Sequence, residues 1–372
     1  MKYYNAKVFT PGGWVKGGFR VENGRFAEIL PGLNEGDENL GGAKVIPGLV
    51  DIHTHGNSGA DFSDGDPDGL KTMAAYCARS GITAFAPTSM TLPFEKLAAA
   101  FQTARALHDE PPAGCARVAG IHMEGPFFSE KKKGAQNGEY LRDPDFEAFE
   151  ELQRGCGGLI RIVDLAPELP GAAEFAAKAS GICRVSVAHT DADYEQAAAV
   201  FDAGASHLTH LFNAMPPIHH RKPGVIGAAS ERENVAAELI CDGIHVHPSA
   251  VRMAFRLFPG RICLISDSLR CGGMPDGEYE LGGQQVFLKD GVARLADGTI
   301  AGASSNLFQD MRNAIRFGIP EEEAIRAATI LPAREIGAGE EIGSVEAGKY
   351  ADFVVCGEDL SLRSVWLGGQ RI

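Results

Sequence analysis

Short apolar runs alternate with amphipathic stretches through the middle of the chain. Runs of strand length occupy residues 46–52, 82–86, 117–121, 160–165, 183–188, 207–211, 236–240 and 262–265. Helical periodicity fills most of the intervals, over residues 67–80, 93–108, 172–180, 193–203 and 248–257. Near-continuous apolar strands that alternate with amphipathic helices indicate a parallel sheet covered on both faces. Eight such units predict an α/β fold of the closed (β/α)8 TIM-type barrel class.

An open, doubly wound sheet is the alternative to this barrel. No Gly-x-Gly-x-x-Gly motif follows the first apolar run to support it. Residues 277–301 break the alternation, because they contain short β segments joined by Gly-Gly and Asp-Gly turns, which are typical of hairpins. We therefore predict a β-hairpin insertion near 277–301 after the eighth strand. A helical pair over 306–316 and 320–330 is expected to complete the barrel.

The two chain ends carry a different pattern, of short β segments separated by glycine-rich turns. The simplest account is one small β-sandwich domain built from residues 1–46 and 336–372. The barrel, over residues 47–335, is then inserted between its two parts.

The charge balance narrows the function classes. With 35 basic and 49 acidic residues the net charge is -14, so we expect no general affinity for nucleic acid or anionic membranes. No apolar run reaches the ~18 residues of a membrane span, and no apolar leader begins the chain. The eight cysteines form no Cys-x-x-Cys pair. We expect reduced thiols and a cytoplasmic location.

Imidazole and carboxylate side chains follow most of the predicted strands. Because catalytic groups of barrel enzymes stand at the C-terminal ends of the strands, these side chains are expected to converge. His53 and His55 lie two positions apart and can face the same way in an extended strand. The set suits a divalent transition metal such as zinc or iron. The residues concerned are His53, His55, Glu124, His189, His210, Asp242, His245 and Asp267.

Taken singly, each of these histidines is more often a satisfied core residue than a ligand, and only their joint placement favours a metal site. Two others are given no role. His122 shares the direction of Glu124 only if the strand is locally regular. His207, three positions before His210, is expected to face the opposite way and to be structural.

The chain resembles the N-acetylglucosamine-6-phosphate deacetylases of the amidohydrolase superfamily. The motifs HMEGPF over 122–127 and HLFNAM over 210–215 are specific to that family, whereas His-x-His is shared across the superfamily. Further matches occur in order at 47–56 (PGLVDIHTHG), 132–136 (KKGAQ), 188–190 (AHT), 242–245 (DGIH), 266–268 (SDS), 298–302 (GTIAG) and 348–352 (GKYAD).

The resemblance implies roles for individual residues. Glu124, His189 and His210 would ligate a metal, zinc or iron. His53 and His55 would hold a second metal, with Glu124 as the bridge. Asp267 would be both a metal ligand and the catalytic acid–base. Substrate contacts would come from Ala135, Gln136, Asn213, Ala214, Arg221, Asp242, His245, Ile300 and Gly302.

The implied reaction is hydrolysis of the acetamide of N-acetylglucosamine 6-phosphate, at one or two metals per subunit. Arg221 would reach the neighbouring subunit's site, which implies a homodimer. Gln136 departs from the family, where some members have a histidine near the acetyl carbonyl. N-acetylgalactosamine 6-phosphate stays open as the substrate.

Two rival readings are disfavoured. Cyclic amidases and base deaminases often bridge two metals with a modified lysine after the fourth strand, and here residues 166–168 (APE) contain none. A non-catalytic scaffold is expected to lose ligands, whereas this chain keeps them all.

Overall fold

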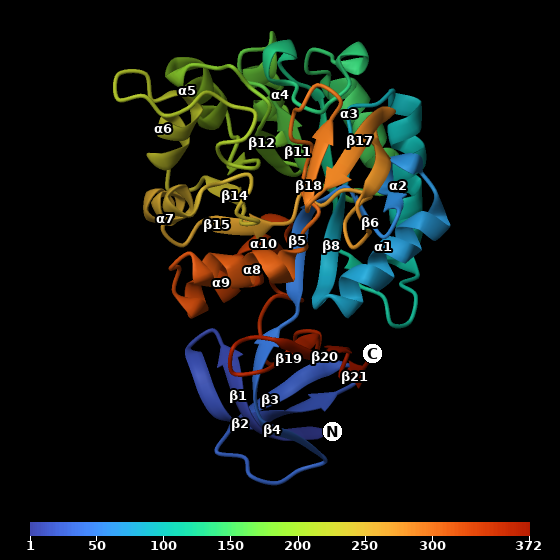
Figure 1. Cartoon of the computed structure of the whole chain (residues 1–372), viewed down its shortest axis with the longest axis vertical. Helices are drawn as coiled ribbons and strands as arrows, with labels where there is room; N and C mark the ends of the chain where they lie inside the picture. The colour runs from blue at the N-terminus through green and yellow to red at the C-terminus, as the bar shows by residue number, and fades with distance from the viewer.

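Eight parallel strands form a barrel in the computed structural model, which describes all 372 residues (Figure 1). The barrel closes where the N–H of Asp267 donates to the carbonyl of His53 at 2.9 Å and that of His55 to Ser268 at 2.9 Å. The predicted (β/α)8 barrel is thereby confirmed. Its strands are β5 (Leu49–Thr54), β8 (Ile82–Ser89), β10 (Ile121–Phe127), β11 (Ile160–Leu165), β12 (Arg184–Val187), β13 (His207–Leu208), β14 (Ala236–Ile240) and β15 (Ile262–Ile265).

The third barrel strand lies further along the chain than the apolar run over 117–121 predicts. That run contributes only the short β9 (Arg117–Val118), which pairs with β8. The barrel strand β10 instead contains His122 and Glu124, both fully buried. The apolar pattern ends before this strand does, because two of the inward-facing residues of β10 are polar.

Ten α-helices surround the barrel. Side-chain caps begin several of them: Asp66 accepts from the backbone of α1, and Asn306 forms a capping box with Gln309 on α8. The helices are α1 (Pro67–Arg79), α2 (Phe94–Asp109), α3 (Phe146–Gly155), α4 (Ala172–Ala179), α5 (Tyr194–Asp202), α6 (Gly224–Ser230), α7 (Pro248–Leu257), α8 (Leu307–Arg316), α9 (Glu321–Ala327) and α10 (Ile330–Glu335). None combines the length and apolar composition that a membrane crossing requires.

The predicted helix over 320–330 ends early, because α9 stops at Ala327 and a separate helix, α10, begins at Ile330. Pro332 has no N–H to donate to the carbonyl of Ala328, four residues earlier, so a continuous helix cannot form there. Thr329 takes a non-helical conformation at the break. Single-turn helices and a short hairpin occupy the loops: η1 (Phe62–Asp64), η2 (Glu130–Lys132), η3 (Gly138–Tyr140), β6 (Gly56–Asn57) and β7 (Ala60–Asp61).

Strands from both chain ends form a separate mixed sheet below the barrel in Figure 1, where both termini lie. Its order is β21-β20-β19-β4-β1-β2-β3, so it is one curled sheet where two facing sheets were expected. The curl brings the rings of Phe26 and Phe353 within 6.1 Å of each other, although three strands separate β3 from β19. The strands are β1 (Lys2–Thr10), β2 (Gly13–Glu22), β3 (Arg25–Pro31), β4 (Glu38–Pro47), β19 (Phe353–Cys356), β20 (Leu362–Leu367) and β21 (Gln370–Arg371).

The segment after β15 forms a three-stranded antiparallel sheet of β16 (Gly277–Leu281), β17 (Gln284–Lys289) and β18 (Val292–Leu295). It stands beside the barrel near the end where β5 finishes (Figure 1). Gln284 Nε2 donates to the carbonyl of Ala135 at 2.5 Å, and Leu281 is buried. The insertion therefore packs against the loops at the C-terminal rim.

Candidate metal centre and substrate cavity

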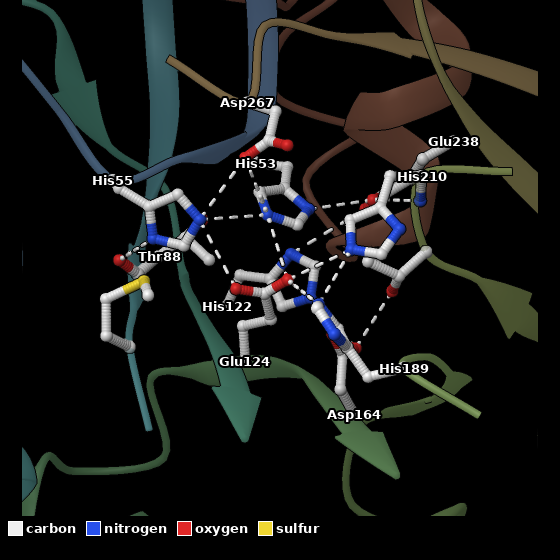
Figure 2. Close-up of polar contacts among 12 residues, drawn as sticks. His53, His55, Thr88, His122, Glu124, Asp164, His189, His210, Glu238 and Asp267 are labelled. Carbon is white, nitrogen blue, oxygen red and sulfur yellow. Dashed lines mark hydrogen bonds and ion pairs between the residues drawn. The ribbon is translucent and has the colours of Figure 1, made fainter. Parts of the chain in front are cut away.

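Four imidazoles converge on the carboxylate of Glu124 (Figure 2). Glu124 Oε1 lies 3.2 Å from His189 Nε2 and 3.1 Å from His210 Nε2. Its other oxygen, Oε2, lies 3.3 Å from His55 Nε2, while His53 Nε2 is 3.7 Å from Oε1. Glu124 thus stands between two histidine pairs, the arrangement expected of a bridging carboxylate.

Asp267 approaches the same centre from β15. Its Oδ1 lies 3.5 Å from His53 Nε2 and 3.3 Å from His55 Nε2. The carboxylate is on the side of the histidine pair opposite Glu124 in Figure 2. All six residues, His53, His55, Glu124, His189, His210 and Asp267, are at least nine-tenths buried.

The hydrogen-bond partners of the rings show what the centre can hold. His189 Nδ1 lies 2.8 Å from the carbonyl of Lys132, and His55 Nδ1 lies 3.1 Å from that of Thr88. A carbonyl oxygen only accepts, so each neutral ring carries its proton on Nδ1 and aims the Nε2 lone pair inward. The inward groups are then nitrogen lone pairs and carboxylate oxygens together, which fit a divalent metal.

The electrostatics of the site favour positive charge at this point. Burial alone would lower the pKa of His55, but Asp267 and Glu124 raise it well above its ordinary value. Burial opposes protonation of His210 in the same way, yet Glu124 raises its pKa to about 9. Conversely, burial would raise the pKa of Glu124, and the surrounding histidines hold it well below its ordinary range.

Strand alternation does not by itself aim these side chains. His189, His210 and Asp267 each lie two residues beyond the end of a barrel strand. Their φ angles of 43°, 30° and 49° are in the left-handed region that non-glycine residues rarely adopt. Such conformations cost free energy and occur preferentially at functional sites. Here they turn three side chains toward the barrel axis at the point where each strand ends.

A cavity of about 320 Å³ opens above the centre. Lys131 and Lys132, which the sequence analysis did not select as substrate contacts, also line it, so two cations of the same chain border the cavity. Seven of the predicted substrate contacts are on its wall: Ala135, Gln136, Asn213, Ala214, His245, Ile300 and Gly302.

Asp242 and Arg221 are not on the wall of this cavity. The Asp242 carboxylate lies 2.7 Å from His245 Nδ1 and accepts the N–H of His245, so it holds that ring in place. Arg221 lies in an exposed loop tip, where it contacts the ring of His220. Its position away from the cavity of its own chain leaves the predicted reach into a neighbouring subunit as a proposal.

Gln136 has a single orientation in this network. Its Oε1 accepts the backbone N–H of Thr91 at 2.7 Å, which forces its Nε2 to face Glu124 Oε2 at 2.6 Å. The amide therefore orients the central carboxylate, and its second Nε2 hydrogen is not used by these contacts.

The side chains of His207 and His122 both lie in the barrel interior. His207 contacts Glu238 and Glu335, which fits the structural role expected of it. His122 shares the direction of Glu124, as a locally regular strand requires, and its Nε2 lies 2.9 Å from Asp164 Oδ1 (Figure 2). Both imidazoles are fully buried inside the barrel.

Sequence reasoning also missed Glu238 and Asp164, two fully buried carboxylates beneath the metal centre. Glu238 Oε2 lies 2.8 Å from His53 Nδ1. Glu238 is the single charged residue of β14, and Asp164 is the buried charged residue of β11, whose other charged residue, Arg161, is only partly buried. That interruption of a strand buried on both faces was the available signal.

Comparison with known proteins agrees with this geometry. A model of the amidohydrolase family matches residues 44–372. The chain belongs to the amidohydrolase family. In this amidohydrolase no lysine follows β11, and the carboxylate that reaches both histidine pairs is Glu124 of β10.

Individual relatives of this amidohydrolase cover nearly all of it. The N-acetylglucosamine-6-phosphate deacetylase of Vibrio furnissii is 40% identical over 352 residues, 94% of this chain and 86% of that protein. The N-acetylgalactosamine-6-phosphate deacetylase of Escherichia coli O157:H7 is 35% identical over 98% of this chain and 97% of its own.

A solved structure shares the whole fold. The N-acetyl-D-glucosamine-6-phosphate deacetylase of Mycobacterium smegmatis, an aspartate-to-alanine mutant in complex with N-acetyl-D-glucosamine-6-phosphate, gives a TM-score of 0.94 at 34% identity. The match covers 100% of this chain and 98% of that one.

Proposed function

We propose that this amidohydrolase hydrolyses the acetamide of N-acetylglucosamine 6-phosphate, giving glucosamine 6-phosphate and acetate. The observation that carries the proposal is the Glu124 centre, with Asp267 against it, at the floor of a cavity of about 320 Å³. A cavity of this size suits a monosaccharide phosphate. The names of the Vibrio furnissii and Mycobacterium smegmatis relatives support the same substrate.

Glu124, His189 and His210 would hold one metal, and His53 and His55, with Asp267, would hold a second. The donor set suits zinc or iron. When bound, such a metal supplies Lewis acidity that activates water and polarises a carbonyl.

Asp267 is the acid–base in this proposal. Its carboxylate accepts a proton from the attacking water and returns it to the leaving amine nitrogen. Burial would raise the pKa of Asp267, but His53 and His55 lower it below its ordinary value, so the carboxylate is ready to accept. Gln136 and His245 line the cavity and would donate to the oxygen of the acetyl group as negative charge develops there.

The phosphate needs cations at the cavity mouth. Lys131 and Lys132 offer them from the same chain. Arg221 would add a bidentate contact from the neighbouring subunit of a homodimer, because its own loop carries it away from its own cavity. All eight cysteines are free thiols, which supports a cytoplasmic location.

The direct test compares initial rates of amine release from N-acetylglucosamine 6-phosphate, N-acetylgalactosamine 6-phosphate and unphosphorylated N-acetylglucosamine. N-acetylglucosamine 6-phosphate should give the largest kcat/KM. Unphosphorylated N-acetylglucosamine should be a poor substrate because its KM is much higher. A preference for N-acetylgalactosamine 6-phosphate would change the proposed sugar but not the proposed reaction. That compound is the second candidate because the Escherichia coli relative is an N-acetylgalactosamine-6-phosphate deacetylase. Release from none of the three would contradict the proposal.

A further inference from the structure

Beneath the metal centre, the barrel interior holds a second set of polar groups that includes His53, His122 and Glu238. This set is not itself a metal site. His122 Nδ1 lies 3.0 Å from the carbonyl of Ile52, which only accepts, so that nitrogen carries a proton and has no lone pair to offer. The set must instead act on the centre above it.

Glu238 is the member of this set that contacts the ligands. Its Oε2 accepts from His53 Nδ1 at 2.8 Å and from the backbone N–H of His210 at 3.2 Å. One carboxylate oxygen therefore joins a ring of one histidine pair to the backbone of the other pair. Its Oε1 lies 3.2 Å from His207 Nε2, which fixes the carboxylate from below.

The contact with His53 decides which nitrogen that ring presents to the cavity. With the proton on Nδ1 donated to Glu238, the lone pair of Nε2 points at the centre, 3.3 Å from His55 Nε2 (Figure 2). His55 and His189 obtain the same tautomer from backbone carbonyls, which no side-chain substitution removes. His53 alone depends on a side chain for it.

We propose that Glu238 is a positioning residue for the second metal. It holds the Nδ1–H tautomer and the orientation of His53, and through His210 it ties the two half-sites together. An acceptor on the outer nitrogen of a metal-bound histidine raises the affinity for the metal. The proposal rests on the proposed metal-dependent function, but not on the identity of the sugar.

The matched variants are Glu238→Met, which keeps the length of the side chain but accepts no hydrogen bond, and Glu238→Gln, which can still accept from His53. Asp164→Asn is the control. Asp164 is an equally buried carboxylate that contacts His122 and Thr209 and no proposed ligand. Circular dichroism and the thermal midpoint establish that each variant folds.

Zinc binding is measured by chelator competition and by metal content per chain after dialysis. The wild-type chain should bind two ions. Glu238→Met should bind the second ion about 10- to 100-fold less tightly. Glu238→Gln should recover most of the loss, and Asp164→Asn should match the wild type. Should Glu238→Met not fold, Glu238→Gln still tests the proposal: it should keep the His53 tautomer and bind both ions nearly as the wild type and Asp164→Asn do, whereas selective loss of the second ion in Glu238→Gln would mean that the carboxylate charge, and not the acceptor, is what matters.

Long-range proton–nitrogen correlation on histidine-labelled protein gives a readout that a purely structural role would not change. In Glu238→Met the His53 tautomer signal should shift, while those of His55 and His189 stay. Three results would overturn the proposal. The wild-type chain could bind only a single ion, or Glu238→Met could keep full zinc affinity and an unshifted His53 signal. The third is a loss of zinc affinity in Asp164→Asn equal to that in Glu238→Met. Failure of the sugar assay with these metal results intact would refute the substrate alone.

Discussion

Replacing His207 by glutamine should reduce the dependence of stability on pH. His207 is fully buried between Glu238 of β14, 3.2 Å from its Nε2, and Glu335 of α10, 3.1 Å from its Nδ1. Arg184 Nε of β12 lies 3.3 Å from the same Glu335 oxygen, Oε2. Burial opposes the charge on His207, but the two carboxylates raise its pKa from 6.5 to about 9.

The sign follows from proton binding. The folded protein binds this proton more tightly than the unfolded chain, so the stabilisation is full below pH ~6.5 and is lost as pH rises through about 9. A pKa raised by two to three units corresponds to about 3 kcal/mol of unfolding free energy. Glutamine can bond both carboxylates but does not titrate, so the variant lacks this contribution.

Urea unfolding of both proteins at pH 6 and at pH 10, in the same metal state, measures the effect. The free energy of unfolding of the wild type minus that of the variant should be about 3 kcal/mol larger at pH 6 than at pH 10. Other groups that titrate in this range, His210 among them, cancel in the difference. A gap that stays constant, or that widens toward pH 10, would refute the reasoning.

Three further predictions concern the site. Asp267→Asn should lower kcat by about 10²- to 10⁴-fold with KM nearly unchanged, measured on protein shown to carry the wild-type metal content because Asp267 is also a proposed ligand, and near-wild-type turnover would exclude Asp267 as the acid–base. Arg221→Ala should raise KM for the phosphorylated sugar, and co-assembly with Asp267→Asn chains should restore activity only if Arg221 acts across a subunit interface. Gln136→Leu leaves the Thr91 N–H without its acceptor and Glu124 without its 2.6 Å donor; it should cost about 1–3 kcal/mol in urea unfolding and lower kcat, whereas unchanged values would mean that the amide orients nothing.

The fold was predictable where burial alone governs the residue pattern. The strands over 160–165, 236–240 and 262–265 coincide with β11, β14 and β15, because strands covered on both faces read as near-continuous apolar runs. The rule failed at β10, whose inward residues His122 and Glu124 serve the site rather than the core.

The candidate site was predictable as a set of residue types at strand ends, but its geometry was not. Left-handed backbone at His210 and Asp267 turns their side chains inward after the strands stop, and no alternation pattern contains that turn. Glu238 was not predicted because only residues that follow the predicted strands were considered as site candidates, and Glu238 lies inside a strand. A carboxylate inside a strand that is buried on both faces needs hydrogen-bond partners, and for Glu238 these are the imidazoles of His53 and His207.

The central claim is that the Glu124 centre holds a metal that is needed to cleave the acetamide. The most direct measurement is amine release from N-acetylglucosamine 6-phosphate by one preparation as purified, after chelation, and after zinc or iron is restored, with metal content determined at each step. The account predicts activity that disappears with the metal and returns with it. Full turnover by chain shown to be free of metal would contradict it.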